Sequence, residues 1–318
     1  MASPTQRAVD PDDVAGLARI AFGPRTAVSA AAPLTGGGFA AVWRVDLADG
    51  RRTVVKIGPP DDARLLRYER DLIPAEAAYL AVVADAGLDL PLPRLLRNGS
   101  DWLFATYLPG TPLAALPSDV DKSMVRRQLG ATVARLHSLE GTSFGYSGDR
   151  PHGDSWPEAF AAMIEALLAD AGDWSVAVPA QAVRTALQRH RKVLDTVDRP
   201  ALLHFDLWDG NVLTDNGRLS GLVDAERWLH GDPLMDFVSP AIYRRIEDEP
   251  GHPFTAGYSV VAPMTFNEPE RIRLALYRLH LYLLMTVEMP SRGMTTAAHD
   301  GRRERLARLL AEELAALL

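Results

Sequence analysis

A short segment in the second half of the chain carries residue types that bind metal ions and accept protons. It reads HFDLWDGN from His204 to Asn211 and continues to Asp224. On an α-helix, at about 100° per residue, Asp206 and Asn211 would point about 140° apart. They can therefore converge only from a loop, which Gly210 permits because glycine adopts conformations that are costly for other residues.

A predicted hairpin follows this loop. The Asn216-Gly217 pair between two short apolar runs is typical of a two-residue β-turn. Because such a turn folds the second strand back along the first, Asn211 and Asp224 return to the same end, beside Asp206. Two oxygen ligands and a separate carboxylate suit Mg²⁺, which shares its shell with phosphate oxygens. The segment therefore predicts a site for Mg²⁺ and a phosphate, the alternative being a surface hairpin with ordinary polar turns.

Two other His-x-Asp triplets in the chain serve as internal controls. They lie at 152–154 and 230–232, and five positions after their aspartates stand Ala159 and Phe237. Neither side chain can bind a metal. Only Asp206 is followed at that distance by an asparagine, so the chemistry is expected at this triplet and not at the other two.

Lysine is rare in this chain and occurs only at Lys56, Lys122 and Lys192. Lys56 lies in the apolar run VVKI, where an ammonium is costly unless it meets an anion. The run therefore predicts that Lys56 binds a phosphate or a carboxylate. The alternative is an edge strand from which the ammonium reaches solvent.

The glycine run Gly36-Gly37-Gly38 begins the pattern G-x-G-x-x-A. In a dinucleotide-binding fold this pattern leads directly into a helix, with an acidic residue about 20 positions later. Here a strand is predicted instead, and the twentieth residue after Gly36 is Lys56. A glycine turn between two strands is typical of a phosphate-covering turn, with a plain tight turn as the alternative. The absence of any Gly-Lys pair excludes a Walker A loop.

These residues need elements to position them, and the pattern predicts a β-rich first part and a helical second part. Three antiparallel strands are expected between Ala27 and Ile57, a helix over 75–86, and strands over 92–96 and 102–108. After a break at 109–112, helices are expected over 122–139, 157–171 and 180–197, a β-like region over 201–223, and helices from 232 to 318. The polar loop 143–155 is a candidate lid. We therefore expect two lobes, residues 1–108 and 109–318.

The composition excludes several classes of protein. The 318 residues carry a net charge of −7, are 47% hydrophobic and include no cysteine, which rules out disulfides, thiolate metal sites and a cysteine nucleophile. The start of the chain lacks the pattern of a secretory signal, and no apolar stretch approaches about 18 residues. We expect a cytoplasmic protein that binds neither membranes nor nucleic acid, with an acidic balance that favours a cationic or metal-complexed ligand. Nothing in the sequence indicates an oligomeric state.

The segment from His204 to Asp224 resembles the H-x-D-x-x-x-x-N catalytic loop and second metal-binding aspartate of the protein-kinase-like phosphotransferases. The sequence segments HFDLWDGNVL, LVDAER and HGDPLMDF are most similar to the aminoglycoside phosphotransferase family, which also includes fructosamine- and choline-kinase-like enzymes. Phe205 stands where the family usually has glycine, and Ala225 where many members have an aromatic residue. The resemblance implies an α+β, bilobal, protein-kinase-like fold with a small antiparallel-sheet N-lobe, one main helix in that lobe and a larger, mostly helical C-lobe.

The resemblance also implies how ATP is held. Lys56 would hold the α- and β-phosphates and pair with Glu76 of the following helix, with Glu69 as the alternative partner. The connector between the lobes would bind adenine through Thr106 C=O and Leu108 N–H. The nucleotide-binding residues implied by the resemblance are thus Gly36, Gly37, Gly38, Lys56, Glu76, Thr106 and Leu108.

On the catalytic side, Asn211 and Asp224 would bind Mg²⁺, and Asp206 would align the acceptor hydroxyl and accept its proton. His204 would brace this loop. Asp232 and Asp236 are expected to cap the next helix and brace the loop as well.

The acceptor implied by the resemblance is a small molecule with a hydroxyl group, first of all an aminoglycoside or another amino sugar. The carboxylates that could bind its ammonium groups are Asp209, Glu226, Glu247 and Asp248. The alternatives are a metabolic sugar or amino-alcohol kinase and a nucleotide-binding pseudokinase that regulates another protein. A protein-kinase activity is disfavoured, because the few residues between Asp224 and Gly231 leave no room for an activation segment.

Overall fold

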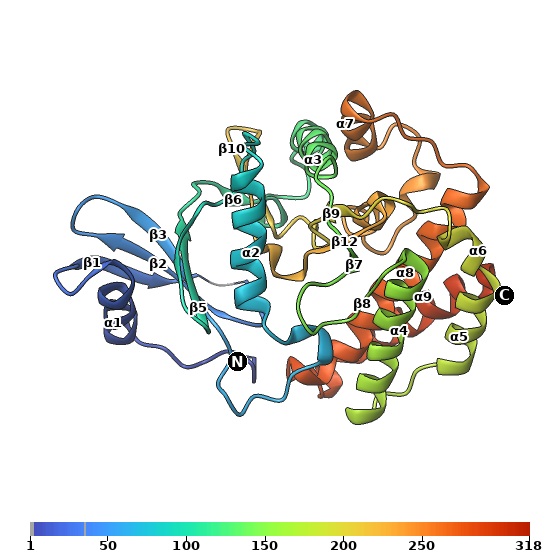
Figure 1. Cartoon of the computed structure of the whole chain (residues 1–318), viewed down its shortest axis with the longest axis horizontal. Helices are drawn as coiled ribbons and strands as arrows, with labels where there is room; N and C mark the ends of the chain where they lie inside the picture. Colours follow the sequence, from blue (N-terminus) through green and yellow to red (C-terminus); the bar gives the residue numbers. More distant parts are fainter. Residues whose placement is uncertain (1–2, 35) are drawn as a thin grey trace.

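The computed structural model describes residues 3–34 and 36–318, and its first part is built around a five-stranded antiparallel sheet (Figure 1). The strands are β1 (Val28–Pro33), β2 (Ala41–Leu47), β3 (Arg52–Ile57), β4 (Leu95–Asn98) and β5 (Trp102–Thr106). Their order in the sheet is β1-β2-β3-β5-β4. Helix α1 (Pro11–Phe22) lies on one side of the sheet and α2 (Leu72–Asp85) on the other.

Alternation along the central strands assigns each residue to one face of this sheet. Trp43, Val45 and Val55 form a buried cluster with Val14 of α1. Lys56 follows Val55 directly, so its side chain emerges on the opposite face, where α2 packs. The period of the strand therefore explains how the lysine comes to face the helix that carries Glu76.

The second part of the chain is mostly helical and lies on the other side of α2 (Figure 1). Its helices are α3 (Ser123–Leu136), α4 (Trp156–Asp173), α5 (Ala180–Arg189), α6 (Arg191–Leu194), α7 (Pro253–Val261), α8 (Glu268–Ser291) and α9 (Asp300–Leu317). The side chains of α2 belong to the same buried apolar cluster as those of α8, so a single core joins the two parts.

Two small sheets lie within this helical part. One has the order β11-β10-β6 and the other the order β8-β7-β12-β9. Their strands are β6 (Thr111–Pro112), β7 (Phe144–Gly145), β8 (His152–Gly153), β9 (Ala201–Leu203), β10 (Val212–Asp215), β11 (Arg218–Leu222) and β12 (Leu229–Gly231). The architecture is the expected α+β arrangement of a small sheet lobe and a larger helical lobe. The lobe boundary at residues 108–109 stays a prediction, and β6, just beyond it, pairs with β10 of the second part.

Several predicted elements differ in the structure. Helix α1 was not predicted, although Asp10 and Asp13 form a capping box around its first turn. Helix α2 begins at Leu72 and holds Pro74 in its first turn, where proline is tolerated. The helix expected over 180–197 is divided into α5 and α6.

Two longer regions also depart from the prediction. Residues 233–248, expected to be helical, form only short 3-10 turns, and α-helix resumes at α7. The candidate lid contains β7 and β8, which pair with each other, and its Tyr146 and Arg150 are buried. This segment is therefore packed against the protein. In the described part of the chain, every helix is too short or too polar to cross a bilayer.

Candidate active site

Asp206 lies in the loop between β9 and β10, and hydrogen bonds to the Asp236 carboxylate stabilise this loop. The backbone N–H groups of His204 and Phe205 donate to the Asp236 carboxylate at 2.9 and 2.6 Å. His137 Nε2 lies 3.0 Å from the same carboxylate. Asp236 thus braces the loop, as expected, and leaves the Asp206 side chain partly exposed.

Asn211 and Asp224 flank the open end of the β10–β11 hairpin. The two turn residues between the strands both have positive φ, which explains the asparagine and glycine found there. Asn211 Nδ2 donates to the backbone oxygen of Asp206 at 2.9 Å. Val223 N–H donates to the backbone oxygen of Asn211 at 3.0 Å, and Asp224 follows directly with φ 69°. The hairpin therefore gathers the three polar residues as its sequence indicated.

Lys56 joins the same site from the sheet lobe. Its Nζ donates to Glu76 Oε2 at 2.6 Å and also forms an ion pair with Asp224. Glu69, the alternative partner, instead pairs with Arg292 at 2.5 Å. Burial acts to lower the pKa of Lys56, but the two carboxylates outweigh it and raise that pKa above its ordinary value.

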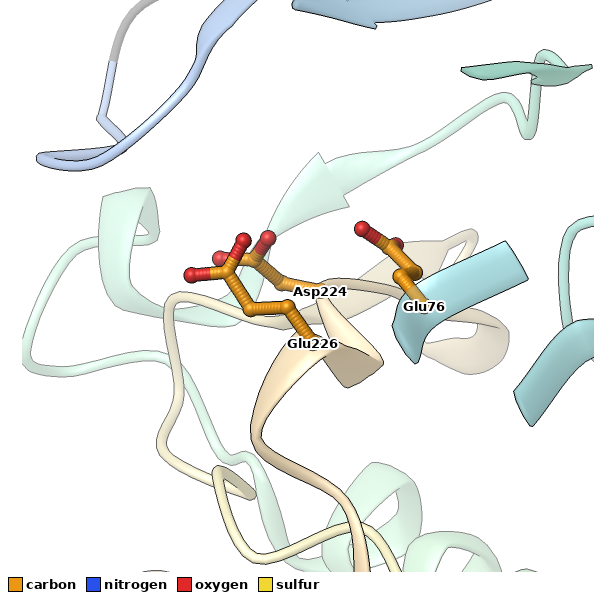
Figure 2. Close-up of side chains that lie close together, drawn as sticks. All are labelled: Glu76, Asp224 and Glu226. Atoms are coloured by element: carbon orange, nitrogen blue, oxygen red, sulfur yellow. The ribbon is translucent and has the colours of Figure 1, made fainter. Parts of the chain in front are cut away.

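Three carboxyl groups surround the Lys56 ammonium. Oxygen atoms of Glu76, Asp224 and Glu226 all lie within 4.8 Å of one another, and Figure 2 shows Asp224 and Glu226 on one segment with Glu76 on α2 opposite. Burial, and then the charge of Asp224, raise the pKa of Glu226 to about 8. Burial also acts to raise the pKa of Asp224, but the Lys56 ammonium prevails and holds it below its usual value. Glu226 is thus a buried neighbour of the predicted metal ligands.

The donor atoms at this point fit the metal that the family implies. Asn211 and Asp224 offer an amide and a carboxylate oxygen, and Glu226 adds a further oxygen donor close to Asp224. An all-oxygen set with few protein ligands suits Mg²⁺ better than a transition metal, which prefers nitrogen or sulfur donors.

Arg227 is a site residue that sequence reasoning missed. Its Nε lies 3.9 Å from Asp206 Oδ2, and its Nη2 lies 2.7 Å from Glu288 Oε1 of α8. Burial raises the pKa of Asp206 above its ordinary value, and the Arg227 charge opposes that shift. No local spacing predicts this contact, because Arg227 and Glu288 are 61 residues apart.

The glycine turn joins β1 to β2 and is held from outside by the segment near the start of the chain. Gln6 Nε2 donates to Gly37 O and Thr5 Oγ1 donates to Gly38 O, both at 2.9 Å. Gly36 has φ 121°, a conformation that favours glycine. The nucleotide-binding role of Gly36, Gly37 and Gly38 stays a prediction.

The predicted adenine-binding connector follows β5. Thr106 ends this strand, and its N–H and Oγ1 both bond the backbone of Arg94 at 2.9 Å. Leu108 packs beside the β10–β11 hairpin, since a Cβ at Gly221 would lie 2.9 Å from Leu108 Cδ1. Within residues 3–34 and 36–318, the Leu108 N–H donates to no other group. It is therefore available for the adenine contact that the resemblance implies.

Three of the four carboxylates expected to bind ammonium groups are engaged elsewhere. Asp209 pairs with Arg126 at 2.7 Å, Glu247 with Arg278 at 2.8 Å, and Asp248 with Arg271 at 2.6 Å. The fourth, Glu226, lies on the Lys56 side of the site. Arginines thus already partner three of the four residues, and the expectation that these carboxylates bind ammonium groups of the acceptor stays a prediction.

Two curated relatives are kinases of small molecules. The chain is 30% identical to the homoserine kinase of Gluconobacter oxydans (strain 621H) over 162 residues, which cover 48% of each chain. It is 25% identical to the probable ketoamine kinase SAOUHSC_02908 of Staphylococcus aureus (strain NCTC 8325 / PS 47) over 249 residues, 71% of this chain and 78% of that protein. The alignment thus spans about half the homoserine kinase and most of the ketoamine kinase.

Solved structures share the fold across nearly the whole chain. A protein of Thermobifida fusca YX-ER1 assigned as a fructosamine-3-kinase is 24% identical, with a TM-score of 0.70 over 95% of this chain and all of that one. The aminoglycoside phosphotransferase APH(4)-Ia, in a ternary complex with AMP-PNP and hygromycin B, is 19% identical, with a TM-score of 0.63 over 96% of this chain and 97% of that one. These likenesses identify the fold as the expected bilobal, protein-kinase-like one.

The match to a family model covers most of the chain, residues 31–275, and is described as the phosphotransferase enzyme family. The matched range contains the glycine turn, Lys56, the Asp206 loop and Asp224. The chain therefore belongs to the phosphotransferase enzyme family and is a small-molecule kinase with a hydroxyl acceptor.

Proposed function

We propose that this protein transfers the γ-phosphate of ATP to a hydroxyl group of a metabolic sugar or amino compound, and that it is not primarily an aminoglycoside kinase. The observation that carries the proposal is the convergence of Lys56, Asp206, Asn211 and Asp224 around one point between the sheet and the helical part. These are the four polar groups that phosphoryl transfer of this type requires.

Each residue has a definite role in the proposed reaction. Lys56, fixed by Glu76, positions the α- and β-phosphates after it leaves its ion pair with Asp224. Asn211 and Asp224 hold Mg²⁺, which supplies positive charge to the phosphate oxygens. Asp206 orients the acceptor hydroxyl and accepts its proton as the oxygen–phosphorus bond forms. Because the transition state is loose, positioning and electrostatics carry most of the rate.

The nucleotide is proposed to lie against the sheet lobe. Gly36, Gly37 and Gly38 would cover its phosphates, and Thr106 C=O with Leu108 N–H would bind adenine. The free N–H of Leu108 supports this placement.

The charges near Asp206 favour a metabolic acceptor over an aminoglycoside. A polycation needs several free carboxylates, and Asp209, Glu247 and Asp248 are paired with arginines. The charged side chain that lies 3.9 Å from the base, Arg227, is a cation. The names of the two curated relatives point the same way, since homoserine and a simple ketoamine each carry one amino group, whereas an aminoglycoside carries several.

An ADP-release screen tests this function. Ketoamines, homoserine, amino alcohols, hexoses and aminoglycosides are each added to the protein with ATP and Mg²⁺, and release is compared with the rate without acceptor. We expect the strongest stimulation from a compound of the first four groups. Stimulation confined to aminoglycosides would overturn the choice of acceptor, and a nucleotide that binds without any ADP release would indicate a pseudokinase.

Replacing the base tests the role of Asp206. Asp206→Asn should lower turnover by about 10²–10⁴-fold, the usual worth of a positioned general base, while ATP still binds. Asp154→Asn is the matched control. Asp154 ends an equivalent His-x-Asp triplet and is exposed, and the fifth residue after it is an alanine instead of an asparagine. Turnover near the wild-type rate in the Asp206 variant would refute the assignment.

A further inference from the structure

Arg227 presents an unused hydrogen-bond donor next to the proposed catalytic base. Its Nε atom is buried and has no hydrogen-bond partner among the described residues. Leaving such a donor unpaired costs about 1–3 kcal/mol. Asp206 Oδ2 lies 3.9 Å from Nε, which is too long for a direct hydrogen bond.

The arginine is held in place from its other end. Nη2 donates to Glu288 Oε1 at 2.7 Å, and the guanidinium lies 5.8 Å from the centre of the Tyr68 ring. Glu288 is itself held by the Tyr68 hydroxyl and by Arg292 at 3.5 Å. Asp206 is fixed separately through its loop, so the two charged groups face each other without closing into a direct pair.

The 3.9 Å between Nε and Oδ2 is a separation that one bridging oxygen atom would span. An oxygen about 2.8 Å from both Nε and Oδ2 would see them at an angle of about 90°, which a hydroxyl group accommodates. A hydroxyl donates one hydrogen and accepts through two lone pairs. Donation to Oδ2 and acceptance from Nε–H therefore leave one lone pair for attack on phosphorus.

We propose that Arg227 is a further catalytic residue, whose Nε–H binds the acceptor hydroxyl oxygen opposite Asp206. This inference rests on the proposed kinase function and adds a residue to it. The acceptor oxygen forms its bond to the γ-phosphorus of ATP while the bond between that phosphorus and the β–γ bridging oxygen breaks. ADP carries away the electron pair of that bond, and the hydroxyl proton passes to Asp206. Arg227 keeps its proton throughout and stabilises the negative charge on the attacking oxygen.

Three variants separate this role from a structural one. Arg227→Met removes the donor, Arg227→Lys keeps the charge but not the Nε–H, and Arg227→Ala leaves a space that methylguanidinium can fill. Arg126→Met is the matched control, because Arg126 also pairs with the catalytic loop, through Asp209, but does not contact Asp206. ADP release is measured with water as acceptor and with the best compound from the screen, alongside ADP affinity and the unfolding temperature.

We expect turnover to fall by about 10²–10³-fold in Arg227→Met and Arg227→Lys, the usual cost of losing one donor to a reacting oxygen, with ADP affinity unchanged. Millimolar methylguanidinium should restore part of the turnover of Arg227→Ala, whereas methylammonium should not. Wild-type turnover in Arg227→Lys, or a loss that methylguanidinium does not restore, would overturn the proposal and leave the kinase function intact. A wild-type protein that releases no ADP with any acceptor would instead refute the proposed function.

Discussion

Phe205 occupies a backbone conformation that is costly for any residue with a side chain. Its φ is 63°, and the left-handed region costs about 1–2 kcal/mol for such residues. Two features hold it there: its N–H bonds Asp236 at 2.6 Å, and its buried ring packs 5.4 Å from the ring of His280. A phenylalanine thus adopts the left-handed conformation here, at a position where the family usually has glycine. Its ring forms part of the buried core next to Asp206.

Replacing this residue with the family's usual one should therefore destabilise the protein only in part. Loss of the ring costs about 3–5 kcal/mol, and relief of the backbone returns about 1–2 kcal/mol. We expect Phe205→Gly to lower the free energy of unfolding by about 1–4 kcal/mol, measured by urea titration. Phe237→Ala, at a buried site without positive φ, is the control and should cost the full amount. An equal loss in both variants would show that position 205 carries no strain.

At the scale of elements, the segment at residues 3–7 orients the glycine turn. Because the C=O and N–H of a trans peptide point in opposite directions, holding Gly37 O and Gly38 O outward turns the next two N–H groups, those of Gly38 and Phe39, the other way. Neighbouring N–H groups that point to one side form an anion-binding concavity. If the glycine turn covers the phosphates of ATP as proposed, the segment at residues 3–7 prepares it for that contact.

Removing both side-chain donors should weaken ATP binding. Each neutral hydrogen bond contributes about 0.5–1.5 kcal/mol, so the double variant Thr5→Val/Gln6→Leu should raise KM for ATP by about fivefold or more, with kcat little changed. Thr185→Val is the control, because its hydroxyl bonds a backbone oxygen of an exposed helix far along the chain. A drop in kcat with an unaltered KM would contradict this role of the segment.

At the scale of the whole molecule, buried histidines make stability depend on pH. Burial lowers the pKa of His280 to about 3 and that of His204 to about 4. In the unfolded chain both titrate near their ordinary value of about 6.5. Between pH 4 and pH 6.5 the unfolded state therefore binds more protons than the folded state. The free energy of unfolding has its full value above pH 6.5, where both histidines are neutral in both states, and it decreases as the pH falls toward 4.

These two groups together should reduce the free energy of unfolding by up to about 2.7 kcal/mol per pH unit in that window, about 1.4 for each. Urea titrations at several pH values from 4.5 to 8 would measure the slope. Replacing His280 with leucine, which keeps an apolar side chain at this buried site, should remove about half of it. A slope that His280→Leu leaves intact would show that other groups govern the acid response.

The parts of the site that could be predicted from sequence are those encoded locally. The loop at Asp206 and the Asn216-Gly217 turn fix where Asn211 and Asp224 go, and the strand period places Lys56 toward α2. Arg227 and Glu288 could not be found in this way, because their contact depends on how α8 packs across the molecule. The arginine partners of the acidic residues expected to bind ammonium groups could not be predicted either. They lie on helices distant in sequence, and they form ion pairs with three of these carboxylates.

Trp228 ties the segment after Asp224 to the helix that carries the partner of Lys56. Its indole N–H donates to Ala75 O at 2.6 Å, one residue before Glu76, and only Ala225 to Trp228 separate Asp224 from β12. In kinases that are switched on and off, the equivalent helix and a long loop after the aspartate move apart or are rearranged by phosphorylation. Here the two are fastened together by one buried ring. We therefore expect the reaction rate to depend on the concentrations of substrate and protein, and not on the activation of an inactive form.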